Sequence, residues 1–147
     1  MRALSSHERT VSEIEGILRD KGVDEESLAE AIEQLHEDLA LDDERFAVRY
    51  AEDKRAISGW GPERIRDALR DRGLPDSLIE PALAAESRDV QLQRAVDFLA
   101  SKGAEVDEPD QRRKALGALA RRGFESEVSY DALREYERTR RDGGGNG

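Results

Sequence analysis

Apolar residues recur at helical spacing from the start of the chain. A first stripe follows Thr10, which fits the N-cap of a capping box with Glu13, and its members are Val11, Ile14, Ile17 and Leu18. A second stripe between about residues 24 and 39 consists of Leu28, Ile32, Leu35 and Leu39. The two stripes predict a pair of amphipathic helices that are joined by a short turn.

A glycine-centred pattern repeats about every fifty residues. Gly22, Gly73 and Gly123 lie 51 and 50 residues apart, and each follows a leucine by four positions and a basic residue by one. An apolar residue comes directly after each glycine. A helix that ends at a left-handed glycine, with a cation in its last turn, explains these matches. The repeat predicts stacked helical units, each too small to bury its own apolar face.

The middle of the chain adds a leading helix to this pair. Asp42 is its expected N-cap, with Leu41 and Phe46 forming a hydrophobic staple. Gly59 and Gly61 then break the chain before Pro62, which suits a first helical position. In the next helix Pro81 is awkward, so we expect either a kink or a helix that starts as late as Ser77.

The last third repeats this plan. A helix from about Arg88 to Lys102 ends at Gly103, a second starts at Pro109, and Ser126 is the expected cap of the third. In total we predict an all-α chain of eight helices in about three tandem three-helix repeats. The repeats are residues 1–40, whose leading helix is largely missing, 41–87 and 88–138, followed by a disordered glycine-rich tail, 139–147.

Composition narrows the classes of function. The 147 residues contain no cysteine, which excludes disulfides and thiolate sites and favours a cytoplasmic protein. No apolar run approaches the roughly 20 residues of a membrane span. Residues 1–40 carry 11 acidic and 4 basic side chains, whereas residues 88–147 carry 12 of each. An acidic first third repels phosphate, so nucleic-acid contact is expected only through later segments.

The stretch LDDERFAVRYAEDKRAISGWGPERIRDALRDRGLPDSLIEPAL closely resembles the RecX family. The HERT segment near the start and the RRGF segment near residue 121 fit the same pattern, and the likeness covers about residues 5 to 137. The residues that carry the likeness in the central stretch are Asp43, Phe46, Ala47, Tyr50, Arg55, Gly59, Gly61, Ile65, Leu69 and Gly73.

The resemblance implies an elongated crescent of three-helix repeats that binds the RecA recombinase. A protein of this kind sits in the groove of the RecA filament, where single-stranded DNA is also within reach. It inhibits filament growth, ATP hydrolysis and strand exchange. We therefore expect a monomeric, non-enzymatic regulator of recombination, DNA repair and the SOS response, without cofactor or metal.

Trp60 and nearby arginines are the first candidate contact site. Trp60 stands between two glycines, where it is either a partner-binding anchor or a plug between helices. Around it lie Arg55, Arg64 and Arg72, which form either a cationic contact surface or surface pairs with carboxylates three or four residues away.

A second candidate set lies on the helix before Gly123. Its basic residues have fewer acidic neighbours and are expected to meet DNA phosphate or an acidic patch: Arg112, Arg113, Lys114, Arg121 and Arg122. His7 and His36 show no spacing typical of catalysis or metal binding. The alternatives to RecA regulation are a direct DNA-binding repeat protein and a helical adaptor for another partner.

Overall fold

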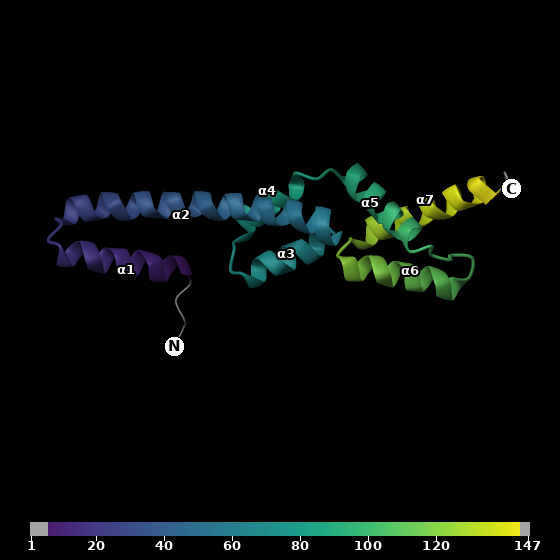
Figure 1. Cartoon of the computed structure of the whole chain (residues 1–147), viewed down its shortest axis with the longest axis horizontal. Coiled ribbons are helices and arrows are strands. Elements are labelled where there is room, and N and C mark those ends of the chain that lie inside the picture. The colour runs from purple at the N-terminus through teal and green to yellow at the C-terminus, as the bar shows by residue number, and fades with distance from the viewer. Residues whose placement is uncertain (1–5, 145–147) are drawn as a thin grey trace. The chain divides into compact units, whose positions relative to one another are not determined.

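The computed structural model describes residues 6–144, which form seven α-helices, one π-helical turn and no strand (Figure 1). The chain divides into two compact units between Ala47 and Val48. The prediction of an all-α protein is confirmed. None of the helices between residues 6 and 144 combines the length and the apolar composition that crossing a bilayer requires.

The first unit is a helical hairpin of α1 (Ser6–Asp20) and the first part of α2 (Glu25–Asp53), which run side by side (Figure 1). Gly22 takes the predicted left-handed conformation, with φ of 80°. Asp24 is the N-cap of α2, because its carboxylate accepts a hydrogen bond from the Ser27 backbone N–H at 2.7 Å.

The predicted start of the first helix at Thr10 is wrong. The helix already begins at Ser6, and Thr10 lies inside it, where its hydroxyl donates to the Ser6 carbonyl at 2.9 Å. No glycine or proline stands between Ser6 and Thr10, so nothing in the backbone stops the helix from extending.

The predicted break near residue 41 is also wrong. Helix α2 runs through Leu41 and Asp42 without interruption and merges two predicted helices into one of 29 residues. The segment between them contains no glycine or proline, and the staple pattern alone does not end a helix. A π-helical turn, Lys54–Ser58, follows and ends at left-handed Gly59.

The second unit contains the remaining helices: α3 (Pro62–Asp71), α4 (Asp76–Ala84), α5 (Arg88–Ser101), α6 (Pro109–Arg122) and α7 (Ser126–Gly144). Helix α5 packs mainly against α7, and α6 also packs against α7. Their shared core includes Leu99, Leu119, Phe124, Val128 and Leu133. A separate pair of helices, α3 and α4, packs with its own buried Ile65, Leu69 and Ile79.

Three boundaries in this unit differ from the predictions. Helix α4 starts at Asp76 and keeps Pro81 beyond its first turn. The first hydrogen bond of α7 goes from the Ser129 N–H to the Glu125 carbonyl, so Glu125 takes the cap position expected for Ser126. The tail predicted to be disordered is helical as far as Gly144, and residues 145–147 lie outside the described residues.

The glycine repeat forms the predicted helix ends at Gly73 and Gly123. The N–H of each glycine bonds the carbonyl three residues back, and the next N–H reaches the carbonyl of Leu69 or Leu119. This is the Schellman arrangement, and it gives the repeated leucine a second task as the acceptor. The residue after the second glycine, Phe124, packs in the same core cluster as Leu119.

The start of α3 docks onto the end of α6. The Gly61 N–H donates to the Arg122 carbonyl at 2.7 Å, and the Glu63 N–H donates to the Gly123 carbonyl at 2.9 Å. Free N–H groups of one helix thus satisfy free carbonyls of the other, and the opposite ends of the two helix dipoles meet. The approach needs glycine, because a Cβ on Gly61 would lie 2.6 Å from the Gly123 carbonyl.

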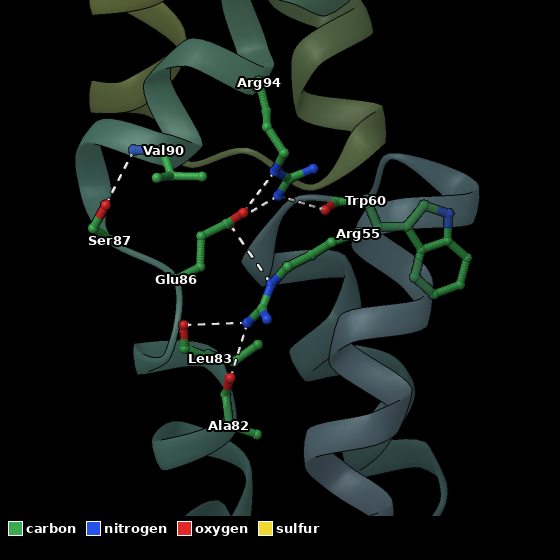
Figure 2. A network of polar contacts seen from close by, with 8 residues as sticks. All are labelled: Arg55, Trp60, Ala82, Leu83, Glu86, Ser87, Val90 and Arg94. Atoms are coloured by element: carbon green, nitrogen blue, oxygen red, sulfur yellow. Dashed lines mark hydrogen bonds and ion pairs between the residues drawn. The ribbon is translucent and has the colours of Figure 1, made fainter.

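A polar network joins the π-helical turn, α4 and α5 (Figure 2). The Arg55 guanidinium donates to the Ala82 carbonyl at 2.9 Å and caps the end of α4. Glu86 accepts two hydrogen bonds from Arg94, at 2.7 and 2.8 Å, and lies 3.7 Å from Arg55 Nε. The Glu86 side chain is only 7% exposed, and burying a carboxylate away from water costs free energy. The contacts with Arg55 and Arg94 offset most of that cost.

Replacing Gly61 with alanine should lower the free energy of unfolding by about 1–3 kcal/mol, because the added methyl cannot fit against the α6 backbone. Urea titration followed by circular dichroism measures this change. The control is Gly117→Ala, whose Cβ would meet only the Arg121 side chain at 3.6 Å and should stabilise the helix. Equal losses in both variants would contradict the close contact at Gly61.

Replacing Glu86 with glutamine should cost about 1.5–3 kcal/mol of stability, because Arg55 and Arg94 then lose their shared anionic partner. Thermal unfolding followed by circular dichroism, which reports the loss of helix, tests this expectation. In the control, Glu135→Gln, an exposed pair with Arg138 is removed and the melting temperature should stay close to that of the wild type.

Candidate interaction surface

Trp60 is held by its backbone while its side chain remains half-exposed. Its N–H donates to the Lys54 carbonyl at 3.1 Å, and its own carbonyl accepts a hydrogen bond from Arg94 at 3.0 Å. Figure 2 shows the indole directed away from the polar network that clamps the main chain. The loop thus presents a large aromatic ring from a fixed backbone.

Cations stack on this ring and on a neighbouring one. Lys54 Nζ lies 4.7 Å from the centre of the Trp60 ring, and Arg64 Cζ lies 4.3 Å from it. Lys54 Nζ is also 5.5 Å from the Tyr50 ring, over which Arg72 lies at 5.0 Å. Each such contact is worth about 0.5–1 kcal/mol at an exposed position. We call Tyr50, Lys54, Trp60, Arg64 and Arg72 the cation-aromatic cluster.

Two other arginines of α3 are neutralised by carboxylates of α4. Arg66 Nε lies 2.6 Å from a Glu80 oxygen, and Arg70 Nε lies 2.9 Å from an Asp76 oxygen. The hydrogen bonds from these guanidinium groups hold the pKa values of Glu80 and Asp76 below their ordinary values. Both arginines are therefore neutralised by carboxylates of the neighbouring helix and not by carboxylates three or four residues away on α3.

The charges of Lys54 and Arg64 are balanced differently. Neither side chain takes part in an ion pair within residues 6–144, and both lie on aromatic rings instead. Arg64 also donates to the Arg121 carbonyl at 3.1 Å. The cluster consequently keeps positive charge beside apolar ring surface, which is a composition typical of protein interface hot spots.

The structure separates Arg55 from this surface. Its side chain is 13% exposed and is used to cap α4 and to approach Glu86. Sequence reasoning placed Arg55 with Trp60, Arg64 and Arg72 but missed Lys54. The signal was available, because Tyr50 and Lys54 are four residues apart on one helix and so share a face.

The predicted basic set on α6 does not form one patch. Arg122 is half-buried, donates to the Ser58 carbonyl and lies 4.9 Å from the Phe98 ring. Arg112 donates to the Val106 carbonyl at 3.2 Å. Both guanidinium groups therefore support the local structure.

The other three members of this set are exposed. Arg113 pairs with Asp110 at 3.1 Å, which neutralises its charge. Lys114 lines an apolar groove between α5 and α6. The Arg121 carbonyl accepts the hydrogen bond from the Arg64 side chain. Their contact with phosphate or an acidic patch stays a prediction.

Neither histidine joins a cluster of ligating side chains. His7 Nε2 lies 2.8 Å from Asp43 Oδ2 within the first unit, and His36 lies in a groove between α1 and α2. Across residues 6–144 no group of three or more histidine, aspartate or glutamate side chains is arranged to hold a metal ion.

Comparisons with known proteins agree on one family. The family model described as RecX, second three-helix domain, matches residues 42–83. The regulatory protein RecX of Deinococcus radiodurans is 36% identical over 135 residues, which cover 91% of this chain and 64% of that protein. Its namesake from Mycolicibacterium vanbaalenii is 28% identical, with 90% of this chain and 77% of the relative covered.

Solved structures give the same result for the fold. The crystal structure of RecX from Lactobacillus salivarius superposes with a TM-score of 0.61 over 92% of this chain and 87% of that one, at 23% identity. A second crystal structure of regulatory protein RecX gives a TM-score of 0.58 at 26% identity and covers 85% of this chain. The matches span both units, and the chain belongs to the RecX family.

Proposed function

We propose that the chain is a non-enzymatic regulator of the RecA recombinase that binds its filament. By this contact it inhibits filament growth, ATP hydrolysis and strand exchange, and so modulates recombination, DNA repair and the SOS response in the cytoplasm. Membership of a family whose named relatives are regulatory proteins supports this proposal. The specific partner comes from the family resemblance of the central segment.

The observation that carries the proposal is the half-exposed Trp60 with two cations stacked on its ring. Tryptophan and arginine dominate protein interfaces because they offer a large contact area and several hydrogen-bond donors. The backbone of Trp60 is fixed from two sides, so binding would cost little ordering of this loop. A flexible loop with the same residues would bind more weakly.

Trp60→Ala should raise the concentration of protein needed to halve RecA ATPase activity on single-stranded DNA by about tenfold or more. The reason is the loss of the ring on which Lys54 and Arg64 lie. Trp60→Phe keeps a ring and should retain most of the inhibition. The assay measures ATP hydrolysis by the RecA of the same organism as the chain is titrated.

The matched arginine pair for this test is Arg64→Ala and Arg134→Ala. Arg134 is exposed on α7 and pairs with Asp131, so its loss should leave inhibition unchanged. Circular dichroism of all variants checks that helicity is kept. Unchanged hydrolysis at several-fold molar excess of wild-type chain would contradict RecA regulation, and salt-sensitive DNA affinity without RecA would favour a direct DNA-binding protein.

A further inference from the structure

The first unit leaves its apolar face uncovered. Helix α1 has no buried residue, and within residues 6–46 only Leu28 is buried. The predicted core stripes remain half-buried at Val11, Ile14, Leu18, Ile32, Leu35 and Leu39. Within residues 6–47 no third helix covers the seam between α1 and α2, so the stripe that was expected to form a core lines a surface instead.

This surface is hollowed into a groove between α1 and α2. Its volume is about 600 Å³, within the range of roughly 300–1,000 Å³ that is common for ligand pockets. Its apolar lining includes Leu28, Ala29 and Ile32, and its carboxylates include Glu15, Glu33 and Glu37. We call it the acidic groove.

The charge of the rim is only partly balanced. Arg19 pairs with Glu15 at 2.9 Å and approaches Glu25 at 3.9 Å. Glu33 and Glu37 take part in no ion pair within residues 6–144. Two exposed carboxylates one helical turn apart thus stand beside unfilled apolar surface.

The surrounding charge restricts what can occupy the groove. Residues 1–40 carry 11 acidic and 4 basic side chains, so a second copy of this hairpin or a nucleic acid would bring like charge against it. An apolar surface between unpaired carboxylates is complementary to a helix with leucine-like residues on one face and lysine or arginine beside them.

We propose that the acidic groove binds a basic amphipathic helix of a protein partner, which packs as a third helix against the hairpin of α1 and α2. Apolar side chains of that helix pack on Leu28 and Ile32, and its cations pair with Glu33 and Glu37. The surface shares no residue with the cation-aromatic cluster, so the proposal stands apart from RecA binding through Trp60.

The test uses the full chain and three fluorescently labelled synthetic helical peptides. The first has leucine on one face and lysine on the other, the second replaces lysine with glutamate, and the third replaces leucine with serine. Anisotropy titration should show the leucine and lysine peptide binding about tenfold or more tightly than either other peptide. Its affinity should fall as salt rises without vanishing, because apolar packing remains.

Two charge-matched double variants locate the site. Glu33→Lys with Glu37→Lys should weaken binding of the leucine and lysine peptide by about tenfold. Glu13→Lys with Asp38→Lys makes the same change in net charge at exposed positions outside the groove and should have a much smaller effect. Circular dichroism confirms that both variants keep their helices.

Several results would overturn the proposal. Equal weakening by both double variants would show attraction to overall charge, and equal binding of the serine peptide would remove the apolar contribution. Absence of binding by the leucine and lysine peptide, or a dimer of the chain in sedimentation that is lost in Ile32→Ser, would show that this groove does not receive such a helix.

Discussion

The contact of the α3 start with the α6 end is the constraint on which the second unit depends. Two backbone N–H groups of α3 meet two carbonyls that the left-handed turn at Gly123 leaves free. The distance between the main chains is so short that neither glycine can carry a side chain. Segments about sixty residues apart are therefore joined by main-chain hydrogen bonds, whose geometry tolerates less variation than side-chain packing does.

The candidate surface depends on the same contact. Trp60 directly precedes Gly61, and Arg64 lies in the first turn of α3. The hydrogen bonds between α3 and α6 therefore fix the backbone from which both side chains extend. Arg94 holds the Trp60 carbonyl from α5, and Glu86 in turn holds Arg94. The half-exposed ring of Trp60 is thus supported by less exposed polar groups, so a change in these supporting groups alters the surface as well.

The helix ends were predictable where a single residue type meets the physical requirement. Only glycine takes the left-handed position cheaply, so Gly73 and Gly123 mark their helices in the sequence itself. The joining of α2 across Leu41 was not predictable, since a weak cap signal competes there with uninterrupted helix formers. Of the candidate residues, Arg64 lies over the Trp60 ring and Arg72 lies over the neighbouring Tyr50 ring. Arg55 instead turns inward and donates to two carbonyls of α4. These acceptors lie 27 and 28 residues further along the chain, so the residues around Arg55 do not indicate this contact.

The chain also divides its charge by unit, and this has a consequence for recognition. In the cation-aromatic cluster, Lys54 and Arg64 make no ion pair within residues 6–144 and lie on an aromatic ring, whereas Glu33 and Glu37 of the acidic groove make none there and lie beside aliphatic side chains. Charge complementarity restricts each surface to a different class of partner and penalises exchange between them by like-charge repulsion. Because each surface joins charge to apolar area, salt can weaken its binding but cannot abolish its preference, since burial of apolar area is not screened by ions.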